Sequence, residues 1–226
     1  MAKTAILVDG NYYLRRAKAL WGDQPSPEER ARELHEYALR HITQRREART
    51  EDERRSLYRI FYYDCRPLQN INVWQPWDGK NRCFNAKDPE YLWKTAFFDC
   101  LSGMRKVAMR MGSVTVGGLH YAMREQAIKD LVAGKRGVSD LGRRDYRLVG
   151  MKQSGVDMRI GIDVASMADD RIVSQIVLVA GDSDFVPVIK FARRRGIDFL
   201  VDPMGNERVR GDLSEESDGI EDMTAC

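Results

Sequence analysis

Short apolar runs, often rich in β-branched residues, recur along the chain and predict strands that are buried on both faces. They cover residues 4–9, 57–64, 146–152, 175–180 and 197–201, with a shorter candidate at 113–116. Runs of this kind are typical of the strands of a parallel sheet, which helices cover on both sides. The pattern therefore predicts a central, mainly parallel sheet.

Helical periodicity appears between most of these runs. Ser26, Pro27 and Glu29 form a strong helix start, with Ser26 as N-cap and Glu29 completing a capping box. This helix is predicted to reach about Arg49, and further helices are predicted at 90–104, at 157–168 and after Phe185. Strands that alternate with helices favour the α/β class. His35 and His41 are expected at the surface or edge of the first long helix.

The pattern is less regular between residues 66 and 145. Residues 68–89 are rich in Asn, Pro, Gly and Trp and predict a long loop beside the sheet, and residues 120–145 predict an irregular or partly helical segment. For Trp74 and Trp77, packing against the domain is favoured over stacking on bases. We interpret residues 1–226 as a single domain with a loop-rich, basic insertion at about 66–145 and an acidic tail at 205–226.

The formal net charge of +3 conceals an uneven distribution. The tail carries seven acidic residues against two arginines, whereas much of the positive excess lies between residues 103 and 152 and includes Arg143 and Arg144. Such an excess fits either an ordinary solvated surface or a face for a polyanionic partner. Leu213 and Ile220 indicate that the acidic tail docks against the domain.

Composition argues against several classes of protein. No apolar run approaches the ~20 residues of a membrane span, and the first residues lack the apolar region of a signal peptide, so a soluble, cytoplasmic protein without membrane contact is expected. Four scattered cysteines and three histidines argue against a zinc site or a disulfide framework. The glycine-rich phosphate loops and the serine elbow are missing.

Acidic residues follow the predicted strands. Asp9 and Asp64 end two of them, Asp182 and Asp184 follow a third, and Asp157 begins the helix after a fourth. One such acid alone is best explained as a helix cap. Several at the carboxyl edge of a parallel sheet, where ligands bind, repel one another and call for a cation. Ligands that are all oxygen favour Mg²⁺ or Mn²⁺.

Two acids of the helix at 157–168 have different expected directions. Asp157 begins the apolar stripe of that helix and is predicted to point along the sheet-facing side. Asp163 lies off the stripe, four residues after Arg159, which predicts a surface pair. A phosphotransferase with Asp9 as nucleophile is an alternative chemistry for the same edge.

Three segments contain candidate acids: Ala-Ile-Leu-Val-Asp-Gly-Asn-Tyr-Tyr at 5–13, Lys-Gln-Ser-Gly-Val-Asp-Met-Arg-Ile-Gly-Ile-Asp at 152–163 and Val-Ala-Gly-Asp-Ser-Asp-Phe at 179–185. Together they resemble the signature blocks of NYN domains, which belong to the PIN-like nucleases. They occur in the order of the family, and Ile-Phe-Tyr-Tyr-Asp at 60–64 extends the likeness. The resemblance implies a PIN-like, three-layer α/β/α fold and a metal-dependent ribonuclease.

By this resemblance, four acids bind Mg²⁺ or Mn²⁺ and serve the hydrolysis of RNA: Asp9, Asp157, Asp182 and Asp184. The expected RNA contacts, made largely to the phosphate backbone, are Asn11, Lys152, Arg159, Arg143 and Arg144. One departure from the family is that Asn11 directly follows Gly10, so that Tyr12 occupies the usual Asn position. An RNA-binding regulatory module with weak or no catalysis is the main alternative, a metal-dependent phosphatase is a third, and homodimerisation stays open.

Overall fold

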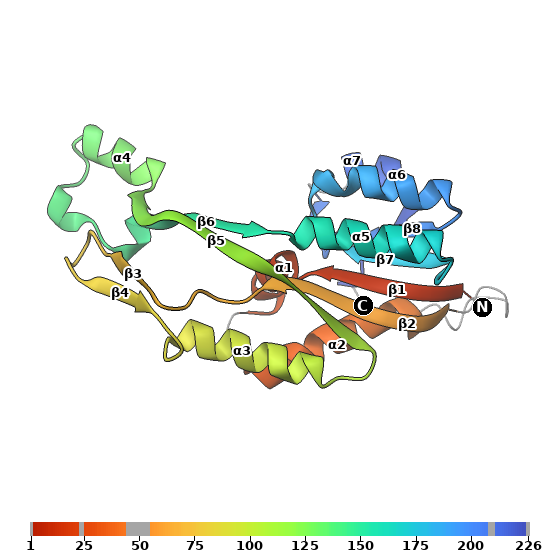
Figure 1. Cartoon of the computed structure of the whole chain (residues 1–226). Coiled ribbons are helices and arrows are strands. Elements are labelled where there is room, and N and C mark those ends of the chain that lie inside the picture. Colours follow the sequence, from red (N-terminus) through yellow and green to blue (C-terminus); the bar gives the residue numbers. More distant parts are fainter. Residues whose placement is uncertain (1, 23–24, 44–54, 208–210, 225–226) are drawn as a thin grey trace.

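The computed structural model describes residues 2–22, 25–43, 55–207 and 211–224, without the side chains of residues 152–154 and 212. Over these residues the chain builds one seven-stranded sheet (Figure 1). The strand order is β6 (Tyr146–Ser154), β5 (Val107–Met123), β2 (Arg55–Cys65), β1 (Ala2–Asp9), β7 (Gln175–Val179), β8 (Asp198–Asp202) and β9 (Gly219–Ile220). Neighbouring strands from β5 to β9 pair in parallel, which confirms the predicted α/β fold with a mainly parallel sheet.

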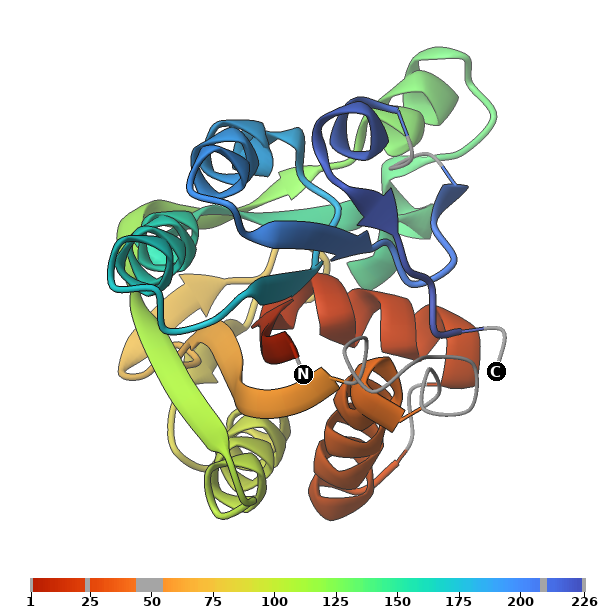
Figure 2. The ribbon, with the colours of Figure 1, turned by 90° about the vertical axis from the view of Figure 1, so that its right-hand side faces the viewer.

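Helices cover both faces of the sheet, so the fold has the three layers that were expected (Figure 2). One face carries α1 (Gly10–Trp21), α2 (Pro27–Thr43) and α3 (Pro89–Ser102), and the other carries α5 (Val156–Asp169), α6 (Val186–Arg194) and α7 (Asp212–Glu216). Along β1, Ala5 and Leu7 pack toward α5 and α6, whereas Ile6 and Val8 pack toward α1 and α2. Because strand side chains alternate, one strand serves two cores.

The direction of winding reverses at β1. From β1 the chain passes through α1 and α2 to β2 and through α3 to β5, whereas β7 and β8 lie on the other side of β1 and use the opposite helical layer. In open α/β sheets this reversal opens a crevice at the carboxyl ends of the two central strands. The fold therefore places Asp9, at the end of β1, beside the turn that follows β7.

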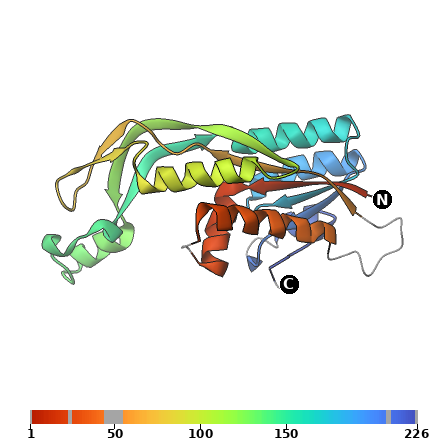
Figure 3. The same cartoon turned by 90° about the horizontal axis from the view of Figure 1, so that it is seen from below.

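The long strand β5 leaves the sheet and builds a projecting arm (Figures 1 and 3). It pairs with β2 only over Val107–Gly112 and then forms an antiparallel ribbon with β6. A hairpin of β3 (Ile71–Trp74) and β4 (Asn81–Phe84) packs on this ribbon, and α4 (Glu125–Val132) lies at its end. We call residues 68–84 and 113–151 the arm.

The arm corrects two expectations. The strand predicted at 113–116 is only part of β5, because Gly117 and Gly118 interrupt the apolar pattern and the pairing register shifts there. The loop predicted at 68–89 is wrong, since it contains the β3–β4 hairpin. Trp77 packs on Tyr121 with ring centroids 4.8 Å apart, whereas Trp74 is exposed. These aromatic contacts come from distant parts of the chain, so local composition does not reveal them.

The start of α2 and the docking of the tail agree with the sequence. Ser26 N–H donates to Glu29 Oε2 over 2.8 Å and Glu29 N–H donates to Ser26 Oγ over 3.2 Å, which completes the capping box. The predicted end near residue 49 lies outside the described residues. In the tail, Leu213 is buried and Ile220 pairs with Val201 at the edge of the sheet.

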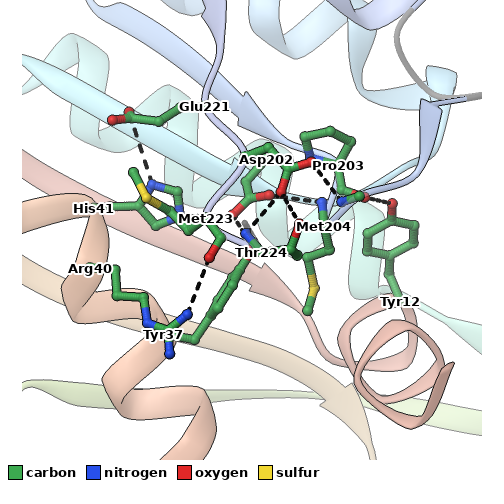
Figure 4. A network of polar contacts seen from close by, with 12 residues as sticks. Tyr12, Tyr37, Arg40, His41, Asp202, Pro203, Met204, Glu221, Met223 and Thr224 are labelled. Atoms are coloured by element: carbon green, nitrogen blue, oxygen red, sulfur yellow. Dashed lines mark hydrogen bonds and ion pairs between the residues drawn. The ribbon is translucent and has the colours of Figure 1, made fainter. Parts of the chain in front are cut away.

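The expected surface position of His41 is wrong (Figure 4). This side chain is fully buried, with Nε2 2.9 Å from Asp202 Oδ2 and Nδ1 3.9 Å from Glu221 Oε2. The hydroxyl of Tyr37 donates to the same Asp202 oxygen over 2.6 Å, and Arg55 Nη1 lies 2.7 Å from Glu221 Oε2. The C-terminal tail covers this end of α2, which helical periodicity alone does not show.

Candidate active site

Asp9 and Asp182 each cap the element that follows them. The Oδ1 atom of Asp9 accepts the N–H of Tyr12 over 3.1 Å at the start of α1. The Oδ1 atom of Asp182 accepts the N–H of Asp184 over 3.1 Å at the 3₁₀ turn Ser183–Phe185. Both carboxylates are thereby oriented by backbone donors at the carboxyl edge of the sheet.

Asp157 reaches the same edge by a different route. Strand β6 returns from the arm and ends with Ser154 opposite Ser113, and Gly155, at φ 81°, then turns the chain into α5. Asp157 is exposed at this corner, so its expected place on the sheet-facing stripe is wrong. The buried stripe of α5 begins instead with Val156. An antiparallel strand thus delivers an acid to the end of a parallel sheet.

The four acids influence one another electrostatically. Burial raises the pKa of Asp9 from 3.8 to about 6, with further contributions from the charges of Asp157 and Asp64, while the Tyr12 N–H and Arg15 oppose the shift. Burial also raises the pKa of Asp157, and the charges of Asp182 and Asp184 add to this effect. The structure therefore brings the four predicted site acids into one electrostatically connected region, whose negative charge Arg15 partly offsets.

A shallow cleft lies over the crevice between β1 and β7. Its walls are Asp9, Tyr12, Arg15, Arg16, Gly181, Asp182 and Asn206. Arg16 is held by the carbonyl oxygen of Met204, at 2.9 Å from Nε and 2.7 Å from Nη2. Asn206 was not among the predicted site residues, because it comes four residues after the end of β8 and belongs to no motif.

Two glycines allow tyrosines to pack under this cleft. A Cβ on Gly181 would lie 2.3 Å from Cε2 of Tyr12, and a Cβ on Gly10 would lie 2.4 Å from the ring of Tyr62. Tyr12 is buried and its hydroxyl donates to the carbonyl oxygen of Pro203 over 2.6 Å (Figure 4). The residue at the usual Asn position of the family motif therefore supports the crevice from below.

The NYN domain family model matches residues 70–212. The chain belongs to the NYN domain family. The match includes Asp157, Asp182 and Asp184, whereas Asp9 lies outside it and is tied to the site by the fold. A similar solved structure is that of a protein of unknown function from Vibrio parahaemolyticus, with 15% identity and a TM-score of 0.44, covering 97% of this chain and 91% of that chain. No curated protein matches this chain.

The donors of this NYN domain fit a hard divalent cation in their chemistry. All four site acids offer carboxylate oxygens, the ligands that Mg²⁺ and Mn²⁺ prefer. Within the described part of the chain, no three His, Cys, Asp or Glu side chains stand close enough together to hold a metal ion. The four acids therefore offer the chemistry of a divalent-cation site but, within the described residues, not the spacing of a three-ligand one.

Two further acids of the NYN domain are occupied by contacts within the fold. Asp64 is buried and accepts from Lys94 Nζ over 2.8 Å and from the Tyr62 hydroxyl over 3.0 Å. Asp163 accepts from Arg110 Nε over 2.8 Å and from the Tyr63 hydroxyl over 2.8 Å, so its predicted pairing with Arg159 is wrong. Tyr63 lies on the neighbouring strand, which the helical spacing of Asp163 does not reveal.

The residues expected to contact RNA lie in two places. Asn11 and Arg159 are exposed on the first turns of α1 and α5, at the carboxyl edge. Arg143 and Arg144 are exposed on the arm, where the Arg143 guanidinium lies 5.6 Å from the ring centroid of Trp77. Lys152 lies on β6, and its side chain is outside the described part.

Proposed function

We propose that this NYN domain is a metal-dependent endoribonuclease that hydrolyses RNA phosphodiester bonds. NYN domains are generally nucleases, so the family itself suggests a nuclease-like, RNA-related function. The observation that carries the proposal is the gathering of Asp9, Asp157, Asp182 and Asp184 at the topological switch point, where burial and neighbouring charge raise the pKa of Asp9. Such a charge arrangement is costly without a cation.

In this proposal the four acids hold Mg²⁺ or Mn²⁺. A cation held there would lower the pKa of a bound water and would offset charge on the scissile phosphate. Asp9 is the fixed member, because the Tyr12 N–H orients its carboxylate and the surrounding crevice partly buries it. The three exposed acids complete the ligand set from the turn after β7 and the start of α5.

The RNA backbone would pass over the carboxyl edge. Asn11 and Arg159 flank the acids there, and Lys152 lies on the strand that leads to them. Arg143 and Arg144 would hold a more distant part of the strand along the arm. These are largely contacts to phosphate, so binding is expected to weaken steeply with salt.

The test is cleavage of labelled single-stranded and structured RNAs in Mn²⁺, in Mg²⁺ and in chelator. Asp182→Asn removes one carboxylate charge, and Asp169→Asn at the opposite end of α5 is the matched control. We expect metal-dependent cleavage by the native protein and by Asp169→Asn, and none by Asp182→Asn. Cleavage that persists in chelator, or in Asp182→Asn at the native rate, would contradict the proposed role of the acids.

An RNA-binding regulatory module is the second candidate function. Two observations favour it: the described acids do not form a ready three-ligand group, and Tyr12 replaces the usual Asn of the motif. RNA binding without cleavage in every metal would support this module. Cleavage of small phosphate esters but not of RNA would instead indicate a phosphatase.

Three broader properties complete the proposal. Within the described residues no helix is long and apolar enough to cross a membrane, and we propose a cytoplasmic location, which cell fractionation tests. We also propose that residues 1–226 unfold as a single domain, with the basic insertion and the acidic tail as parts of it, which calorimetry tests. Homodimerisation is measured by light scattering.

A further inference from the structure

A second pocket lies where the arm meets the sheet, and the site described above does not use it. Its volume is about 260 Å³. The end of β2, the start of α3 and the ribbon of β5 and β6 enclose it. Its apolar walls are formed by Leu68, Phe84, Val114, Leu148 and Met151.

The rim of this arm pocket carries available positive charge. Arg66 and Arg143 are exposed on it, and no ion pair among the described residues engages either of them. The Arg143 guanidinium also lies over the rings of Trp77 and Tyr121, at 5.6 and 5.8 Å from their centroids. Arg82 lies 3.1 Å from Asp88 and 3.3 Å from Glu90, so its single charge offsets one of these two rim acids. Because Lys94 is paired with Asp64, Arg66 and Arg143 leave the rim with a small positive excess. An apolar interior with a cationic rim suits a flat aromatic ring that carries a phosphate.

Two chain segments connect the arm pocket to the carboxyl edge of the sheet, where the four site acids lie. Cys65 lines the pocket directly after Asp64, and Lys94 lines it while holding Asp64 Oδ1 at 2.8 Å. Met151, which also lines the pocket, lies on β6, the strand that leads to Asp157 at the start of α5. Lys94 also lines another pocket, which Asn11 borders, so the Lys94 ammonium group lies between the two pockets. An RNA strand bound at the four acids would therefore meet the arm pocket next.

We propose that the arm pocket receives one unpaired nucleotide of an RNA strand, adjacent to the phosphodiester at the acids, which makes single-stranded RNA the substrate class. The inference rests on the proposed RNA-directed function. The pocket lies just below the ~300–1,000 Å³ of typical small-molecule sites, so it suits one base with its sugar. Bases in a duplex are stacked and paired, and only an unstacked base can enter an enclosed pocket.

The experiment measures binding in chelator, so that cleavage does not enter the result. Met151→Glu places a negative charge on the pocket wall, and Val132→Glu makes the same change of charge at the end of the arm, where Val132 is 84% exposed. Fluorescence anisotropy is recorded for a short single strand and for its blunt duplex. Thermal denaturation of both variants establishes that they are folded.

We expect the native protein to prefer the single strand, and Met151→Glu to weaken that binding by about tenfold or more, in the range for one stacked base. Val132→Glu is expected to change it by less than about threefold, and the duplex is expected not to distinguish the two variants. Equal losses in both variants, preference for the duplex, or mononucleotides that bind as tightly as the strand would each overturn the inference.

Two outcomes separate the inference from the proposed function. Native cleavage together with equal binding by both variants would overturn the arm pocket alone. Absence of cleavage in every metal, together with binding that depends on Met151, would overturn the enzymatic proposal and leave the nucleotide pocket in place.

Discussion

Replacing Asp9 with Asn should stabilise the metal-free protein while abolishing the proposed activity. The Asn side chain retains an oxygen that can accept the Tyr12 N–H, but it removes a partly buried charge. The pKa of Asp9 rises from 3.8 to about 6, mainly through burial, and a shift of about two units corresponds to about 3 kcal/mol against the ionised form. Partial exposure to solvent screens part of this cost, so Asp9→Asn is expected to raise the free energy of unfolding by about 1–3 kcal/mol at pH 7.

The pH dependence of this difference has a defined sign. Between pH 3.8 and about 6 the folded state binds more protons at Asp9 than the unfolded state. The contribution of Asp9 to stability is therefore fully present below the unfolded pKa and is lost as the pH rises through the folded pKa. The advantage of Asp9→Asn over the native protein should accordingly grow from pH 4 to pH 7.

The assay is urea denaturation of both proteins in chelator at several pH values across this range. Asp182→Asn is the matched control, because Asp182 is exposed and likewise accepts a backbone N–H, so little change in stability is expected. A folded Asp9→Asn protein that is less stable than the native one at pH 7 would refute the electrostatic reasoning. Added Mn²⁺ should raise the melting temperature of the native protein but not of Asp9→Asn, and RNA cleavage should be lost in both variants.

Two further predictions concern positions that hold the edge of the sheet together. Gly181→Ala should lower the free energy of unfolding by about 1–3 kcal/mol in chemical denaturation, because its Cβ would overlap the Tyr12 ring. Gly117→Ala is the control and should be close to neutral, because its Cβ would have nothing within 4 Å. Equal effects of the two substitutions would contradict the close approach of Gly181 to Tyr12. Glu221→Gln should cost about 3–5 kcal/mol at pH 7, because it leaves the buried Arg55 without its anion. Despite burial, hydrogen bonds from His41 and Arg55 lower the pKa of Glu221 to about 2. This stabilisation is therefore lost as the pH falls from 4.5 toward 2, and the difference in stability between variant and native protein should narrow over that window. A difference that is constant with pH would count against the assignment.

Local chemistry was enough to predict much of the fold. The capping box of Ser26 and Glu29 and the run from Gln175 into Asp182 depend only on near neighbours in the chain, and both predictions match the structure. The acids at strand ends were visible for the same reason, since parallel strands bring their carboxyl ends to one edge. The NYN family match agrees with the motif-based resemblance.

Contacts between distant segments produced the errors. His41 was expected at the surface or edge because it is polar, although it lies three residues after Ala38 on the apolar face of its helix. Asp202 and Glu221, more than 150 positions later, provide the polar partners that allow its burial. Asp163 was expected to pair within its own helix, but a hydroxyl and a guanidinium from two neighbouring strands bind it instead. Helical spacing describes one element and carries no information about what packs on it.

The sequence by itself determined the α/β class, the buried strands and the placement of acids where those strands end, because hydrophobic period and capping act over a few residues. Only the tertiary structure decided that β5 leaves the sheet, that β6 returns antiparallel to deliver Asp157, and that the arm forms a pocket beside Asp64. Strand register and direction depend on pairing across many residues of chain, where several arrangements satisfy the same local pattern. Packing of the whole chain selects one of them.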